Sequence, residues 1–196
     1  SVESDKESEC ALKYMIEYMK EKDPKSRPFQ LHRIDKDTSG VLIFTKDIKL
    51  HSMLKMHWNE QITKREYYAI CVGKFEKKKD TIVSYLKENQ NNIVYITKNE
   101  KDRDAKKAIT NYEVVKENDN FSLLKITIDT GRKNQIRVQM ASLNHPIIGD
   151  EKYGNEVNPI GRLGLHASAV EFIHPVTKEK IFIKANLPDE FKKFMR

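Results

Sequence analysis

Residues 32–40 read HRIDKDTSG and run directly into the apolar tetrapeptide VLIF at residues 41–44. The first stretch is rich in polar and turn-forming residues, whereas the second has the composition of a buried strand. This order predicts that Asp35 lies in a polar turn and that a strand over residues 40–45 leads away from it. We expect the chemistry of the protein at this turn.

Four later segments give this stretch a context. They read KREYYA (64–69), TGRKNQIR (130–137), PIIGD with YG (146–150 and 153–154), and LHA with HP (165–167 and 174–175). Taken in order, the segments resemble the RluA-type pseudouridine synthases, whose catalytic motif is HR(L/I)DxxTSG and whose later segments include KxxYxA, TGRxHQ(L/I)R and PIxGD. The resemblance covers residues 30–190, and every fixed position of the catalytic motif is present.

The resemblance implies a fold and a reaction. The fold is α+β, with a mixed, mainly antiparallel central sheet, flanking helices and a central active-site cleft. The reaction is isomerisation of uridine to pseudouridine in ribosomal or transfer RNA. It breaks the C–N glycosidic bond, rotates the freed uracil and rejoins it to the ribose through carbon 5. Because this needs neither a redox step nor an energy source, we expect no cofactor.

The resemblance also implies roles for single residues. Asp35 is expected to act on the ribose as nucleophile or base, and the choice between these roles stays open. Tyr67 is expected to pack against the uracil; because successive side chains of a strand face opposite ways, Tyr68 then points away. Arg137 is expected to pair with Asp35, lower the pKa of its carboxyl and fix its orientation. Leu165 is expected to complete the apolar wall under the base.

Each of these residues has an ordinary interpretation when it is taken alone. An Asp among polar residues in a turn most often forms the turn or caps a helix. An Arg at the position of Arg137 is common on helix surfaces. The agreement of all the segments, in order, favours the catalytic interpretation of Asp35.

A net charge of +7 and a pI of about 9.2 indicate a polyanion such as RNA as partner, although a well-solvated basic surface has the same composition. A base within stacked or paired RNA must be extruded to reach such a pocket, and cationic side chains along the rim hold the splayed backbone. We predict substrate contacts at Arg33, Thr38, Lys107 and Arg132. Further candidates for the rim or its loop are Ser39, Arg103, Lys106 and Lys133.

Several classes of site are excluded by pattern. Cys10 and Cys71 form no CxxC pair, the six histidines show no HExxH spacing, and no glycine-rich phosphate loop is present, so we predict no metal and no nucleotide cofactor. No apolar run approaches the roughly 18 residues that suggest a membrane span, and no signal-peptide pattern occurs. We therefore expect a cytoplasmic protein without a membrane partner, and favour a monomer.

Local patterns predict the helices. A capping box at residues 4–7 begins a helix with apolar positions at Leu12, Met15, Ile16 and Met19. Asp47 can cap a second helix, which has Leu50, Leu54 and Trp58 on one face. A third helix follows Gly131, with apolar positions at Ile136, Met140 and Leu143.

Strands are predicted where β-branched and aromatic residues lie between turn formers. Their ranges are 67–72, 82–86, 93–97, 108–115, 121–128, 165–173 and 180–185. We assign residues 1–29 to an N-terminal helix and linker and residues 30–196 to one catalytic domain.

Three departures from the family matter. Relatives carry an upstream strand and an NKPxG segment that residues 1–31 lack, so we expect a chain shortened at this end. Asn134 and Gln139 stand where His is frequent, and both are expected to adjust hydrogen bonds around the site.

Two other functions remain as hypotheses. One is a basic RNA-binding or assembly module that keeps the synthase fold without turnover, although it has no chemical need for the catalytic set. The other is hydrolysis of a glycosidic bond, which needs a second carboxylate opposite Asp35. Asp37 is a poor candidate for it, because it lies at a variable position of the motif.

Overall fold

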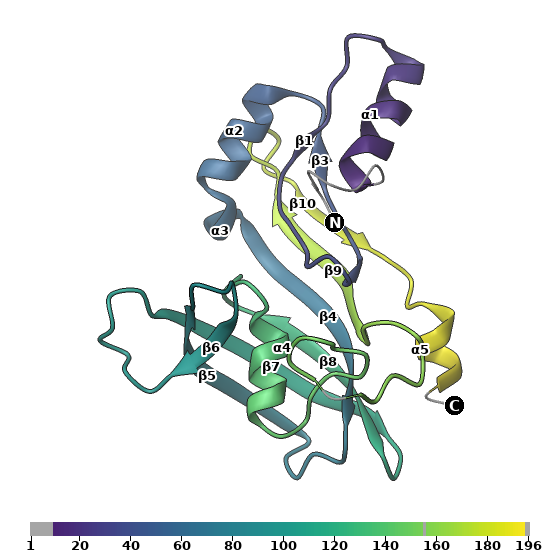
Figure 1. The fold of residues 1–196 in the computed structure, drawn as a ribbon. Helices are drawn as coiled ribbons and strands as arrows, with labels where there is room; N and C mark the ends of the chain where they lie inside the picture. The colour runs from purple at the N-terminus through teal and green to yellow at the C-terminus, as the bar shows by residue number, and fades with distance from the viewer. Residues whose placement is uncertain (1–9, 155, 195–196) are drawn as a thin grey trace.

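In the computed structural model, which describes residues 10–154 and 156–194, a long twisted sheet connects the two ends of the molecule (Figure 1). Its strands follow the spatial order β10 (Lys180–Lys184), β9 (Leu165–Ile173), β4 (Ile62–Val72), β8 (Phe121–Ile128), β7 (Lys106–Glu117), β5 (Lys79–Glu88) and β6 (Val94–Thr97), with β2 (Ser39–Gly40) beside β9. Neighbours along the path pair antiparallel, whereas β2 pairs parallel to β9. The predicted α+β fold with a mixed, mainly antiparallel sheet is confirmed.

Five helices of the described residues lie around this sheet. They are α1 (Ala11–Lys22), α2 (Ile48–Met56), α3 (Trp58–Gln61), α4 (Gln135–Ser142) and α5 (Asp189–Phe194). Figure 1 shows α1 and α2 at one end, beside the small sheet of β1 (Phe29–Gln30) and β3 (Phe44–Thr45), and α4 at the other end, against the strands β5 to β8. The predicted cap of α2 is confirmed, because the side chain of Asp47 accepts a hydrogen bond of 2.7 Å from the Leu50 N–H. The capping box predicted at residues 4–7 lies outside the described residues.

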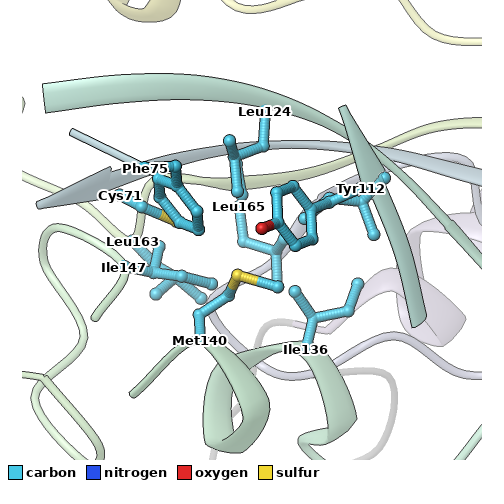
Figure 2. Close-up of a cluster of buried hydrophobic side chains, with 11 residues drawn as sticks. Cys71, Phe75, Tyr112, Leu124, Ile136, Met140, Ile147, Leu163 and Leu165 are labelled. Atoms are coloured by element: carbon cyan, nitrogen blue, oxygen red, sulfur yellow. The ribbon is translucent and has the colours of Figure 1, made fainter. Parts of the chain in front are cut away.

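The core lies on both faces of β4. In Figure 2, Ile136 and Met140 point from α4 toward Leu124 of β8 and Tyr112 of β7, in the cluster that also contains Leu165 of β9. A second buried cluster, on the other face, is formed by Ile70, Leu123, Ile148 and Phe191. Because strand side chains alternate, β4 contributes to both clusters and joins them into one body.

The prediction of one strand over residues 40–45 is wrong, because these residues belong to two separate short strands, β2 and β3. Gly40 ends β2 with φ of 121°, a backbone conformation that glycine adopts without strain, and a side chain there would collide with the Ala167 backbone. The chain then leaves β9 and pairs with β1 only from Phe44 onward. No single partner strand accompanies residues 40–45, because the chain passes from one sheet to the other.

Most other predicted elements are present. β8 and β9 have the predicted bounds, whereas β5 and β7 are longer because their antiparallel pairing extends from Lys79 opposite Glu113 to Leu86 opposite Lys106. Such pairing brings polar residues into strands that composition alone would end. α5 was not predicted; it is short, and it is held by the fully buried side chain of Phe191.

Candidate active site

A cavity of about 500 Å³ lies between the turn at residues 32–38, the strands β4 and β9, and the loop that enters α4. Its lining contains all but one of the predicted site residues: Asp35, Tyr67, Arg137, Leu165, Arg33, Thr38 and Arg132. Lys107 is the exception. The fold thus brings predicted site residues that are up to 132 positions apart, Arg33 and Leu165, around one cavity.

The turn that carries Asp35 is fixed by its attachment to β9. The Thr38 N–H donates a hydrogen bond of 3.1 Å to the Asp35 carbonyl, which closes the turn. Ser39 then pairs with His166 of β9, and its hydroxyl lies 2.8 Å from the imidazole Nδ1 of that residue. The turn is therefore held beside the strand that supplies Leu165 to the cavity, with the Asp35 side chain 26% exposed.

Burial dominates the electrostatics of Asp35. It raises the pKa of the Asp35 carboxyl, and the positive charges of Arg137 and Arg33 offset only part of this rise. Arg137 lies beside Asp35 as expected, but its Nη1 is 3.7 Å from Oδ2, which is too long for a hydrogen bond. Arg137 thus lowers the pKa of Asp35, as expected, but desolvation outweighs the guanidinium, so the net pKa is raised.

The principal partner of Arg137 is Asp150. The guanidinium donates from Nε to Oδ2 at 2.8 Å and from Nη2 to Oδ1 at 2.7 Å, a two-point contact. Oδ1 also accepts hydrogen bonds of 3.0 Å from the N–H groups of Lys152 and Tyr153. Burial by itself raises the pKa of Asp150, but Arg137 and these backbone donors outweigh it, so the net pKa is lowered.

Asp150 is a site residue to which the sequence analysis gave no role. It belongs to the PIIGD segment, so a signal was present, but nothing local shows that this Asp faces Arg137 thirteen residues earlier. Asp150 lies in the turn that follows an isolated bridge between Ile147 and Cys71 of β4. Only this long-range pairing brings the turn against α4.

Tyr67 and Leu165 form one wall of the cavity. They lie on neighbouring strands, where β4 pairs Tyr67 with Ala167 and Ala69 with Leu165. Tyr68 packs against the cluster on the other face of the sheet, so the predicted division between the two tyrosines agrees with the geometry. Burial raises the pKa of Tyr67 to about 12, so its phenol stays protonated near neutral pH.

His32 and Trp58 extend this wall, and neither was predicted to line the site. Their rings stack with a centroid distance of 5.5 Å and an interplanar angle of 15°. Burial lowers the pKa of His32 to about 4, and its Nε2 accepts a hydrogen bond of 3.2 Å from the Ile43 N–H. His32 is therefore neutral near pH 7 and supports the turn instead of adding charge.

The predicted RNA contacts separate into two groups. Arg33, Thr38, Arg132 and Lys133 line the cavity, and the buried Thr38 hydroxyl has no hydrogen-bond partner in the part of the chain that the structure describes. Lys107 lies outside the lining, where its carbonyl accepts a hydrogen bond of 3.0 Å from Arg132 Nε. Arg103 and Lys106 are also absent from the lining.

Two buried amides stabilise the loop and helix around Arg132. The Gln135 Oε1 accepts hydrogen bonds from the Thr130 hydroxyl at 2.8 Å and the Arg132 N–H at 3.0 Å, which fixes the entry to α4. Gln139, one of the two departures from the family pattern, bonds to the Ser84 and Thr110 hydroxyls away from the cavity lining. The other departure, Asn134, lines the cavity beside Asp35.

This arrangement limits the chemistry. A partly exposed carboxylate, a guanidinium beside it, a neutral phenol and an apolar wall suit a planar, uncharged ring with its attached sugar, and a carboxylate so placed can serve as a nucleophile or a base. Among the described residues, no group of three or more His, Cys, Asp and Glu side chains is arranged to hold a metal ion. In the same residues, no helix has the length and apolar character to cross a membrane.

Comparison with known proteins identifies similar chains. Residues 2–142 match the family described as RNA pseudouridylate synthase. The chain is 35% identical over 198 residues to the ribosomal large subunit pseudouridine synthase C of Buchnera aphidicola, an alignment that covers 92% of this chain and 60% of that protein. It is 30% identical over 186 residues to the tRNA pseudouridine synthase C of Haemophilus influenzae, covering 85% of this chain and 77% of the other.

The fold has a solved counterpart. Human RNA Pseudouridylate Synthase Domain Containing 4 superposes with a TM-score of 0.77 at 20% identity, covering 95% of this chain and 82% of that one. The chain spans little more than half the length of several curated relatives, 55% and 57% in two Bacillus subtilis proteins.

Proposed function

This chain belongs to the RluA-type family of RNA pseudouridine synthases, and we propose that it isomerises uridine to pseudouridine in ribosomal or transfer RNA. The observation that carries the proposal is the convergence of Asp35, Arg137, Tyr67 and Leu165 on one cavity. The names of two relatives, one acting on the large ribosomal subunit and one on tRNA, support the choice of substrate class.

In the proposed reaction Asp35 either bonds to carbon 1′ of the ribose and displaces the uracil as its anion, or removes a ribose proton so that the uracil anion leaves; in both cases the C–N bond breaks. The detached uracil stays against the wall formed by Tyr67 and Leu165 and turns. Its carbon 5 then bonds to carbon 1′, which frees Asp35 or returns the ribose proton, and the hydrogen of carbon 5 is lost as a proton while the former glycosidic nitrogen takes one up. A base stacked on an aromatic ring gains about 1–3 kcal/mol, which retains it after its covalent link is lost. Because Tyr67 stays protonated near neutral pH, it contributes a ring wall and a hydroxyl donor, not a base.

The charges and pKa shifts in the cavity support these roles for Asp35 and the residues around it. The Asp35 carboxyl is buried enough for its pKa to be raised, which makes it more basic and more nucleophilic than a carboxylate in water. The positive charge of Arg137 favours the ionised form of the buried Asp35 carboxyl. Asp150 holds Arg137 in place through two hydrogen bonds. Arg33 and Arg132 are proposed to bind phosphates at the rim.

We extend the proposal to the rest of the chain. Residues 30–196 form the catalytic domain, and the helix and linker within residues 1–29 belong to it. Since the proposed substrates are ribosomal and transfer RNA, we propose a cytoplasmic monomer that works without metal or cofactor.

The proposal is tested by tritium release from unmodified ribosomal and transfer RNA transcripts labelled at carbon 5 of uridine. Release requires that carbon 5 exchange its hydrogen for a bond to the ribose. We expect release by the parent chain and by Asp37→Asn, a matched loss of one charge in the same turn, but none by Asp35→Asn. Release by Asp35→Asn at the parent rate contradicts the role of Asp35, and no release by the parent from either RNA contradicts the function.

A further inference from the structure

Asn134 lies between Asp35 and Tyr153 at the start of α4. It caps this helix in the left-handed conformation, with φ of 52°, and its side chain is buried, with 7% of the residue exposed. The amide nitrogen can lie 2.9 Å from Oδ2 and 3.1 Å from Oδ1 of Asp35, while the amide oxygen lies 2.9 Å from the Tyr153 hydroxyl. The amide therefore bridges the carboxylate and the phenol.

The neighbours of this amide fix its orientation. An ionised carboxylate only accepts hydrogen bonds, so an amide oxygen facing Asp35 would oppose two acceptors. The Tyr153 hydroxyl accepts a hydrogen bond of 3.0 Å from the Val94 N–H of β6, which leaves its own proton for the amide oxygen of Asn134. The orientation with nitrogen toward Asp35 satisfies the carboxylate, the amide and the phenol, and it gives up only a long hydrogen bond of 3.4 Å from Arg137 Nη1 to the amide oxygen.

Asn134 is thus closer to Asp35 than Arg137 is. The guanidinium stays 3.7 Å from the carboxylate because its two short hydrogen bonds are made to Asp150. We propose that Asn134 is a positioning residue that orients the Asp35 carboxylate in the cavity through two hydrogen bonds, with Tyr153 fixing the amide. This inference rests on the proposed isomerisation for its kinetic consequences only, since the carboxylate itself can be observed without turnover.

The hydrogen bonds from Asn134 should affect the pKa of Asp35. The charged and titratable groups around Asp35 are Arg33 on its own turn, Arg137 on α4, Asp150 on the turn after α4, and Tyr67 on β4. The two arginines favour the ionised carboxylate, whereas Asp150 and burial oppose it. Hydrogen bonds to the charged form also favour it. Loss of the Asn134 amide should therefore raise the pKa of Asp35 further.

The test compares two Asn→Gly substitutions at the two ends of α4. Asn134→Gly removes the amide, and glycine accepts the left-handed conformation without strain. Asn144→Gly is the matched control, because Asn144 has φ of 62°, is exposed and is not part of the cavity lining. Any effect that comes only from a more flexible backbone appears in both variants.

Two measurements are made on the full chain. The first is the pH titration of ¹³C-labelled aspartate carboxyls by NMR, in which the resonance of Asp35 is identified by its loss in Asp35→Asn. The second is tritium release at a series of RNA concentrations across the same pH range, which gives both kcat and KM. For Asn134→Gly we expect the Asp35 resonance to titrate at higher pH than in the parent, and kcat near neutral pH to fall about tenfold or more with KM nearly unchanged. Asn144→Gly should match the parent in both.

Two further variants make the result decisive. Asn134→His keeps a hydrogen-bond donor at this position and should recover most of the lost kcat, whereas Tyr153→Phe should cause a smaller upward shift of the Asp35 titration by freeing the amide. The inference is overturned if Asn134→Gly and Tyr153→Phe both keep the parent titration. If the parent titrates as expected but releases no tritium, the proposed function fails while the carboxylate measurement still decides this inference.

Discussion

Two turns of the chain each direct a carboxylate toward Arg137, and the two carboxylates differ in almost every respect. Asp150 is 1% exposed, receives two hydrogen bonds from the guanidinium and two from backbone N–H groups, and has a lowered pKa. The side chain of Asp35 is 26% exposed, its Oδ2 lies 3.7 Å from Nη1 of Arg137, and its pKa is raised. The carboxylate with the most partners stabilises the site, and the one with fewer partners remains available for reaction.

The largest expected effect separates activity from stability at Asp35. Asp35→Asn should lower turnover by about 10⁴-fold or more, as expected when an essential group is removed. The unfolding free energy at neutral pH should not fall, because the substitution removes a buried charge whose ionised form is disfavoured by folding. Single-turnover kinetics and urea denaturation of the same preparation measure both quantities. A variant that loses activity and stability together would show that Asp35 is mainly structural.

The matched substitution, Asp150→Asn, should have the opposite profile. It leaves the buried guanidinium of Arg137 without its charged partner, and such a loss typically costs about 3–5 kcal/mol of folding free energy. Turnover should also fall, but less than in Asp35→Asn, because the reacting carboxylate is still present. Urea denaturation near pH 7 checks the stability, and an unchanged midpoint would contradict the supporting role of Asp150.

The two carboxylates should also differ in the pH dependence of stability. The pKa of Asp150 is lowered in the folded state, so its stabilising contribution is present above its unfolded pKa of about 3.9 and is lost as pH falls through the folded value. The pKa of Asp35 is raised, so its destabilising contribution appears as pH rises from about 3.9 through the folded value.

The difference in unfolding free energy between the parent and each Asn variant, measured from pH 3 to 7, should therefore change in opposite directions for the two sites. If the two differences change in the same direction with pH, the proposed opposite pKa shifts of Asp35 and Asp150 are contradicted.

The smallest expected effect concerns the rim of the cavity. Arg132→Ala should weaken RNA binding several-fold and reduce the slope of log affinity against log salt by about one, because one phosphate contact is lost. Lys107→Ala removes the same charge and should change both quantities less, since Lys107 is not part of the cavity lining. It also leaves the backbone carbonyl that accepts the hydrogen bond from Arg132 Nε in place. Binding titrations at several salt concentrations compare the two, and equal effects would mean that general charge, not the rim, binds RNA.

The sequence was informative where structure depends on neighbours along the chain. The bounds of β8 and β9 and the cap of α2 by Asp47 were predicted correctly, because alternation, β-branched composition and capping act over a few residues. The grouping of Asp35, Tyr67, Arg137 and Leu165 also agrees with the prediction, since the family segments carry these residues in a fixed order. Their catalytic roles stay predictions.

The sequence failed where two distant segments compete or combine. Residues 40–45 have the composition of one strand, yet Gly40 pairs with β9 and Phe44 pairs with β1, so the strand is interrupted. α5 depends on one buried Phe191 and offers no long apolar stripe to detect. The net rise of the Asp35 pKa was missed, because a sequence pattern indicates the nearby guanidinium, which does lower the pKa, but not the extent of burial, which raises it more.

The sequence by itself determined which family this chain joins, which carboxylate lies in the polar turn, and where most strands run, because these properties depend on residue identity and short-range periodicity. Only the tertiary structure decided that Arg137 binds Asp150 more tightly than Asp35, and that Asn134 stands between Asp35 and Tyr153. Hydrogen bonds of about 3 Å depend on the relative positions of a helix, a turn and two strands, which are set by the register of the sheet and by the packing of α4 against it.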